Sequence, residues 1–181
     1  MRETDYPDGS PNADQLLFLL GYAILAPSSH NTQPWKFRVS DGAIDIFADR
    51  ARWLKVADST RRELHISVGC ALENLLIAAE HFGFEHKLDF LPRAEDHELC
   101  ATVSFISGRE PSAYRPPELF GAITRRGTFH GKFENRAIQP QTLAAMENLC
   151  VESGLRVLFT DDLDIKRKVD ELVVRGDAVQ F

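Results

Sequence analysis

The chain has 181 residues, 44% of them hydrophobic, so it is long enough for an ordinary domain with a sizeable core and too apolar to be wholly disordered. Twenty-seven acidic and twenty-one basic residues leave a net charge of -6, whereas proteins that grip nucleic acid present a basic surface. The longest apolar stretch, residues 16–27, is about half of the roughly 20 residues that span a bilayer. We therefore expect a globular, cytoplasmic protein without a nucleic-acid or membrane partner.

The three cysteines, Cys70, Cys100 and Cys150, are isolated in the sequence, with no CxxC pair and no histidine at metal-ligand spacing. An odd number of scattered cysteines indicates neither a disulfide framework nor a zinc site. We predict that they are core thiols and that the chain has no metal site.

The chain begins with a polar segment that is followed by an apolar one. Residues 1–12 contain Pro, Gly, Asp and Asn without apolar periodicity and are predicted to form a flexible arm. Residues 13–25 are apolar at nearly every position, which predicts a helix buried on all sides, with Asn12 as a candidate cap. Pro27 and Pro34 prevent the helix from continuing, so the polar residues between them are predicted to form a loop.

Two short aromatic-rich runs, residues 35–39 and 43–47, are separated by the turn signal Ser-Asp-Gly at residues 40–42. They predict a β-hairpin. Thr60 to Glu63 then match a capping box, and apolar residues follow at helical spacing as far as Gly83. This is the longest predicted helix, and the small residues 69–71 in its middle are explained by tight packing or by a flat ligand close to the backbone.

Strands are predicted at residues 87–91 and 100–106, because apolar and polar residues alternate there. Three prolines at residues 108–117 mark a boundary between two parts of the chain. Beyond it the pattern predicts helices at residues 119–125, 141–153 and 163–175, the last capped by Asp161 or Asp162, and a strand at residues 155–159.

Six polar side chains at residues 28–33 lie between two prolines, after an apolar helix and before an aromatic strand. Such a loop offers hydroxyl, amide and backbone N–H groups to a ligand that is rich in acceptors, although an ordinary turn would be polar too. Residues 27–35, PSSHNTQPW, resemble the PSSxNxQPW segment of the FMN-dependent nitroreductases. The resemblance implies that Gln33, Pro34 and Trp35 fix the loop and start the strand, and that FMN is contacted by Pro27, Ser28, Ser29 and Asn31.

A longer pattern is similar to the Acg-type branch of that family, whose members carry two nitroreductase-like halves in one chain. It comprises Arg52-Trp53-Leu54, Asp58, Arg62-Glu63-Leu64 and the small-residue helix at residues 67–79. The resemblance implies an α+β fold in which helices flank an antiparallel or mixed sheet, with a long buried central helix. It divides the chain into a first half at residues 13–107, a linker at 108–117 and the start of a second, incomplete half at 118–181.

A second candidate cluster, residues 125–133, comes at the end of the short helix predicted at residues 119–125. Clustered Arg, hydroxyl and His donors suit a phosphate, but a basic run on a solvated surface is also common. The segment resembles the RRSxRxF element that holds the FMN phosphate in nitroreductases, although Gly127 interrupts it and a histidine replaces the second arginine. By this resemblance four more residues contact FMN: Arg125, Arg126, Thr128 and His130.

In an ordinary nitroreductase the Arg-rich element precedes the PSSxNxQPW loop, whereas in this chain it follows the loop. The resemblance therefore implies one flavin site between the two halves of the chain, where an ordinary dimer forms two. The resemblance implies electron transfer from NAD(P)H through FMN to a nitro compound, quinone or similar small acceptor, with no side chain acting as acid or base. We expect a homo-oligomer or a missing C-terminal half. Two alternatives stay open: a non-catalytic protein that sequesters FMN, and an inactive truncated remnant.

Overall fold

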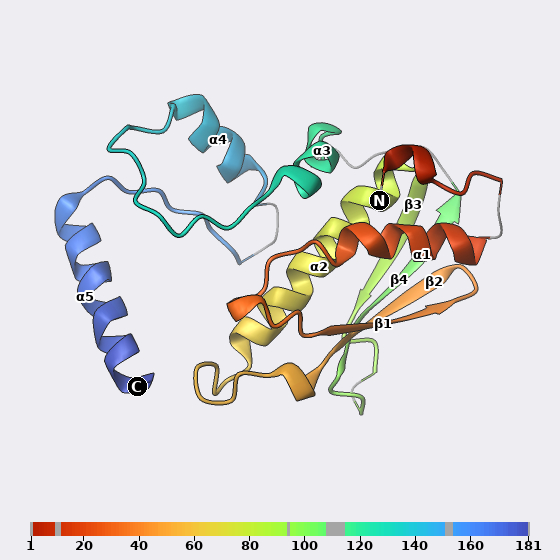
Figure 1. Cartoon of the computed structure of the whole chain (residues 1–181), viewed down its shortest axis with the longest axis horizontal. Helices are drawn as coiled ribbons and strands as arrows, with labels where there is room; N and C mark the ends of the chain where they lie inside the picture. The colour runs from red at the N-terminus through yellow and green to blue at the C-terminus, as the bar shows by residue number, and fades with distance from the viewer. Residues whose placement is uncertain (1, 10–11, 94, 108–114, 151–153, 181) are drawn as a thin grey trace. The chain divides into compact units, whose positions relative to one another are not determined.

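The computed structural model describes residues 2–9, 12–93, 95–107, 115–150 and 154–180. The chain divides into two compact units, Met1–Phe129 and His130–Phe181 (Figure 1). In the described residues, no helix is both long enough and apolar enough to cross a membrane.

The first unit is built on a four-stranded sheet that begins with the predicted hairpin. β1 (Trp35–Ser40) and β2 (Ala43–Ala48) pair antiparallel, with Ser40 opposite Ala43. The turn between them places Gly42 at φ 70°, a left-handed conformation that glycine adopts without a Cβ clash. The hairpin prediction is therefore confirmed.

The other two strands extend the sheet from β2. β3 (Phe84–Phe90) and β4 (Leu99–Ser107) are antiparallel, and the strand order is β1-β2-β4-β3. These four strands are antiparallel throughout, so the predicted α+β class is confirmed and the sheet is not mixed. Each strand alternates: one face is apolar, and the other carries polar pairs such as Arg38 with Asp45.

Two helices cover the apolar face of the sheet (Figure 1). α1 (Asn12–Ala23) packs along α2 (Arg62–His81), and α2 contacts β1, β2 and β3. Nine residues of α2 are buried, which makes it the long central helix that was predicted. The inner sheet residues beneath the helices include Ile44, Ile46, Ala101 and Val103.

The start of α2 differs from the predicted capping box. The residue before the helix, Arg61, is left-handed at φ 62°, and it makes no side-chain cap. Instead the buried carboxylate of Asp58 accepts the backbone N–H groups of Glu63 at 3.1 Å and Leu64 at 2.9 Å. Asp58 thus satisfies two helical donors that the prediction gave to Thr60.

α1 is not buried on all sides, contrary to the prediction. Leu17 is 56% exposed, and just after the helix Ile24 is 46% and Leu25 40% exposed, because only one side of the segment meets α2 and β1. Asn12 itself lies within α1, whereas it was a candidate for a cap before the helix. Apolar sequence alone therefore did not distinguish a buried helix from one with an apolar outer side.

A short 3-10 helix, Glu3–Asp5, lies within the segment that was predicted to be a flexible arm. The Tyr6 ring stacks on Phe82 with a centroid distance of 4.3 Å and also meets the edge of Phe18. These contacts place the beginning of the chain against the end of α2. The flexibility of residues 1–12 stays a prediction.

α3 (Glu118–Arg125) forms where a short helix was predicted. It groups with the first unit, since Phe120 and Ile123 are buried and the unit extends to Phe129. Residues 108–114 of the predicted linker lie outside the described residues. The assignment of residues 13–107 and 118–181 as two halves stays a prediction.

The described residues of the second unit form two helices, α4 (Pro140–Asn148) and α5 (Leu163–Gln180). Asp162 caps α5, since its Oδ1 accepts the N–H groups of Asp164 and Ile165 at 2.8 and 3.0 Å. The strand predicted at residues 155–159 was wrong: these residues form no strand, and Leu158 is 87% exposed. A strand needs a partner for its backbone, and no described residue pairs with this segment.

Candidate functional site

The loop between α1 and β1 has an unusual backbone. Its single 3-10 turn covers Ser29–Asn31, and three of its residues have positive φ: His30 at 50°, Asn31 at 54° and Gln33 at 49°. Residues with a Cβ avoid this region, so the conformation persists only where surrounding contacts hold it. Pro34 is buried and Trp35 begins β1, which agrees with their expected roles.

Two hydroxyls within the loop fix its shape. The Oγ of Ser28 accepts the N–H of Gln33 at 2.9 Å, and the Oγ1 of Thr32 donates to the Ser29 carbonyl at 2.9 Å. The N–H groups of Asn31 and Thr32 bond back to the carbonyls of Ser28 and Ser29. The loop therefore closes on itself through both side chains and backbone.

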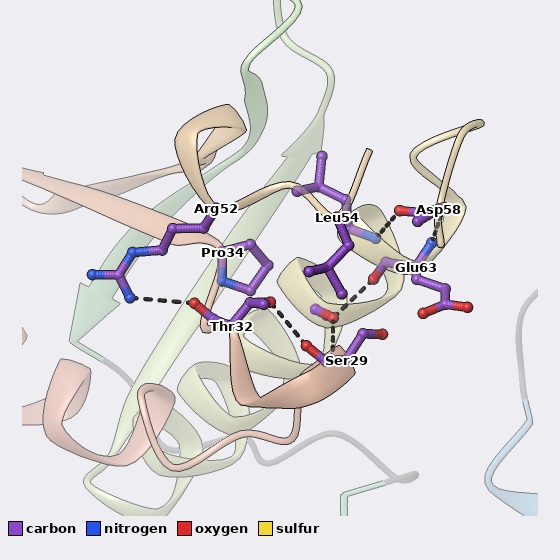
Figure 2. Close-up of a pocket in the computed structure, with 9 residues that line it drawn as sticks. Ser29, Thr32, Pro34, Arg52, Leu54, Asp58 and Glu63 are labelled. Atoms are coloured by element: carbon purple, nitrogen blue, oxygen red, sulfur yellow. Dashed lines mark hydrogen bonds between the residues drawn. The ribbon is translucent and has the colours of Figure 1, made fainter. Parts of the chain in front are cut away.

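Two further side chains reach the loop from other elements (Figure 2). From α2, the Oγ of Ser67 accepts the Ser29 N–H at 3.3 Å and donates to the Glu63 carbonyl at 2.8 Å. From the segment after β2, the Nη1 of Arg52 donates to the Thr32 carbonyl at 3.2 Å. The loop is thus attached to the central helix on one side and to the end of the hairpin on the other.

A small pocket lies between the loop and the beginning of α2 (Figure 2), lined among others by Ser29, Arg52, Asp58 and Ser67. Its volume is about 10 Å³, which is room for about one water molecule. A flavin ring cannot enter it. This small pocket is therefore not a flavin site.

The four loop residues predicted to contact FMN differ in exposure, and Ser29 lines the small pocket itself. Pro27 and Asn31 are exposed, whereas Ser28 and Ser29 are half-buried. The Ser29 amide is taken by Ser67, but the amides of Ser28 and His30 have no hydrogen-bond partner among the described residues. Two backbone donors of the loop are thus without a hydrogen-bond partner among the described residues.

Arg126 brings part of the second predicted cluster to the start of this loop. Its Nη2 donates to the Leu25 carbonyl at 3.2 Å, two residues before Pro27, and its Nη1 lies 3.4 Å from the Oγ1 of Thr128. Burial raises the pKa of the Cys70 thiol in α2, and the positive charge of Arg126 acts in the opposite direction. Arg126 therefore lies near α2 as well as near the loop.

The Arg125 side chain makes no hydrogen bond to the loop among the described residues. The Arg125 guanidinium turns back over Gly121 of its own helix, 3.5 Å from where a Cβ on that glycine would stand. His130 is the first residue of the second unit. FMN contacts by all eight predicted residues stay a prediction.

Ser67, Arg52 and Asp49 were not among the residues predicted for the site. Ser67 carried a usable signal, because it is a polar residue on the buried stripe of a helix that is otherwise lined with Leu, Val and Ala. Arg52 belonged to the Acg-type pattern but was given no role there. The buried Asp49 pairs with Lys36 and Arg52. No sequence pattern indicated this role, because Lys36 is distant in sequence and the contact with Arg52 depends on the turn after β2.

No three His, Cys, Asp or Glu side chains gather as a possible metal site in the part of the chain that the structure describes. The three cysteines are free and half-buried. Burial raises the pKa of the Cys100 thiol as it does that of Cys70. The groups that the structure gathers at the loop are backbone and hydroxyl hydrogen-bonding groups and the guanidinium groups of Arg52 and Arg126.

Comparison with curated proteins gives several relatives that are named as nitroreductases, whereas no family model matches the chain. "Putative NAD(P)H nitroreductase Rv3131" of Mycobacterium tuberculosis is 29% identical over 156 residues, which cover 85% of this chain and 44% of the relative. "Putative NAD(P)H nitroreductase acg" of the same organism is 28% identical over 55% of this chain and 30% of the relative. "Probable NAD(P)H nitroreductase PigM" of Serratia is 37% identical over 48% of this chain and 24% of the relative.

The chain thus aligns with less than half the length of these relatives. Among solved structures, "Putative NADH Oxidase" from Clostridium acetobutylicum has a TM-score of 0.45 and 17% identity, over 57% of this chain and 82% of the other. That structural likeness is too weak to add to the relationship. The sequence comparisons confirm the resemblance to proteins named as NAD(P)H nitroreductases, and an Acg protein is among the sequences that the chain matches.

Proposed function

We propose that the chain forms one side of an FMN site in an NAD(P)H-dependent oxidoreductase of the nitroreductase type. The observation that carries the proposal is the loop at residues 27–34, which is held from several sides, presents the free amides of Ser28 and His30, and begins beside Arg126. The named relatives support the class of protein, since each is described as an NAD(P)H nitroreductase.

The donors present fit this cofactor. The flavin ring edge is rich in hydrogen-bond acceptors, which the amides of Ser28 and His30 and the exposed side-chain amide of Asn31 can meet. Arg126 uses two of its N–H groups on Leu25 and Thr128, which leaves further donors of its planar fork for a phosphate. These residues would hold the ring edge and the phosphate.

When bound, FMN supplies the acceptance of hydride from NAD(P)H and the transfer of electrons to a nitro compound, quinone or similar small acceptor. The chain's own residues bind and orient the cofactor, and no side chain is required as acid or base. Self-association, or completion by the remainder of a longer chain, belongs to the same proposal. It is supported by the exposed apolar side chains of Leu17, Ile24 and Leu25.

The binding test titrates FMN into the purified full chain and follows flavin fluorescence and the visible spectrum. Arg126→Ala is expected to weaken FMN affinity by about tenfold or more, because a charge-assisted contact is lost. Ser40→Ala is the matched control, since Ser40 lies in the hairpin turn and bonds the Ala43 carbonyl. A wild-type chain that binds no FMN would overturn the proposal, and equal affinities for the two variants would remove Arg126 from the site.

The turnover test adds NADH or NADPH to the FMN-loaded chain without oxygen. Loss of the flavin colour within seconds, followed by its return when a quinone or nitro compound is added, is expected for an oxidoreductase. Colour that persists with both nucleotides would instead show a protein that sequesters FMN. This measurement therefore separates the enzyme from the non-catalytic alternative.

A further inference from the structure

The loop's left-handed stretch ends beside a guanidinium that comes from outside the loop. The Nη1 of Arg52 lies 3.2 Å from the Thr32 carbonyl oxygen and 3.5 Å from that of Gln33. A positive φ at Gln33 turns the peptide units on either side of it, so their carbonyls need a donor in an unusual direction. One planar guanidinium meets both (Figure 2 shows the bond to Thr32).

Arg52 is itself held by Asp49, which is only 6% exposed. The Oδ2 of Asp49 lies 3.5 Å from the Nε of Arg52, while its Oδ1 bonds the Lys36 ammonium at 2.8 Å and the Ala51 N–H at 3.1 Å. The backbone of Asp49 is tied as well, because its N–H donates to the Pro34 carbonyl at 2.9 Å. Asp49 is therefore anchored to the end of the same loop that Arg52 contacts.

We propose that Arg52, oriented by Asp49, is a positioning residue that holds the loop in its left-handed conformation and so sets the direction of the free Ser28 and His30 N–H groups. Arg52 does not need to touch a ligand for this role. The part of the proposal that concerns FMN rests on the proposed function. The part that concerns the loop stands on the contacts alone.

The proposed role of residue 52 requires the planar guanidinium group of an arginine. Its Nε faces the carboxylate while its Nη1 faces the loop carbonyls, so one rigid plane joins two partners that are fixed independently. A lysine ammonium is a point donor on a flexible stem and cannot span both partners in the same way. We therefore expect Arg52→Lys to behave more like Arg52→Ala than like the wild type.

The test compares the full chain with Arg52→Ala, Arg52→Lys and Arg38→Ala by amide hydrogen exchange of the peptides that cover residues 27–34, and by FMN titration. Arg38 is the matched control: it pairs with Asp45 on the outer sheet face and is 54% exposed, against 55% for Arg52. Arg52→Ala and Arg52→Lys should each speed exchange of the loop amides about tenfold and weaken FMN binding about tenfold. Arg38→Ala should change neither.

Equal loop exchange in Arg52→Ala and Arg38→Ala would overturn the role of Arg52, as would wild-type exchange in Arg52→Lys. Faster exchange throughout the sheet would overturn it too, because the effect would then be general destabilisation. If the wild type binds no FMN, the proposed function fails, and the exchange rates still decide the role in the loop. If exchange rises while FMN affinity stays unchanged, Arg52 holds the loop but does not position a flavin.

Discussion

α2 in the first unit and α5 in the second were both predicted from apolar residues at helical spacing, and both are helices. They differ in burial: α2 buries nine residues, including Leu75 at 0% exposure, whereas Leu172 and Val174 of α5 are 63% and 67% exposed. Helical spacing depends on the residue order of one segment, whereas burial depends on what lies against it. Stability should therefore be concentrated in the first unit, and this difference can be tested.

The largest expected effect comes from truncating the core at α2. Leu75→Ala should lower the free energy of unfolding by about 2–5 kcal/mol, because it removes buried methyl groups and leaves a cavity. Urea unfolding followed by circular dichroism measures it. The control is Leu172→Ala on α5, which should change the value by no more than about 0.5 kcal/mol, as exposed substitutions do. Similar losses for both variants would show that α5 is packed as tightly as α2.

The second-largest effect concerns the residue that caps the beginning of α2. Asp58→Ala should cost about 0.5–2 kcal/mol, since the N–H groups of Glu63 and Leu64 lose their acceptor. Thr60→Ala should cost almost nothing, although the sequence pattern gave the cap to Thr60. The same urea titration measures both variants. A larger loss for Thr60→Ala would restore the capping box and contradict the cap that the structure shows.

Much of the first unit could be predicted from local sequence. The hairpin, the long helix and the two later strands follow from alternation, helical spacing and turn residues, which act over a few positions. What the sequence could not show were contacts between distant segments. Asp58 displaces Thr60 as the cap because of how the chain turns before α2, and α1 keeps an exposed apolar side because its neighbours cover one side of it.

The candidate site, too, could be predicted only in part from the sequence. The motif PSSHNTQPW identified the loop, and Arg126 was predicted to lie near it, but only the fold places the Arg126 guanidinium on the Leu25 carbonyl. Ser67 and Arg52 reach the loop from elements 38 and 20 residues away in sequence. Those partners depend on tertiary packing, and a single sequence does not reveal it.

A smaller effect concerns Asp49 and depends on pH. The hydrogen bond from Lys36 lowers the pKa of this carboxyl, burial acts in the opposite direction, and the Ala51 N–H and the charges of Lys36 and Arg52 lower it further. Because the pKa is lower in the folded state, the stabilisation is present above the ordinary value of 3.8 and is lost as pH falls through the folded value.

Asp49→Asn should therefore lower stability by at most about 1 kcal/mol near pH 7, where its cationic partners are largely exposed. The difference from wild type should shrink as the pH falls from about 5 through 3.8 and below. Urea midpoints measured across that range test it. A constant difference at all pH values would show that the carboxylate charge contributes nothing.

The smallest expected effect concerns residues 155–159, where a strand was predicted and none formed. Leu158→Pro removes a backbone donor, which in the interior of a sheet disrupts the ladder. Because Leu158 is 87% exposed and lies in a segment without strand pairing, the substitution should change the unfolding free energy by no more than about 0.5 kcal/mol. Val103→Pro in β4 is the matched control and should prevent stable folding, since Val103 is fully buried and pairs with both β2 and β3. A large loss for Leu158→Pro would mean that residues 155–159 pair as a strand in solution after all, and the contrast between the two units would then extend only to their helices.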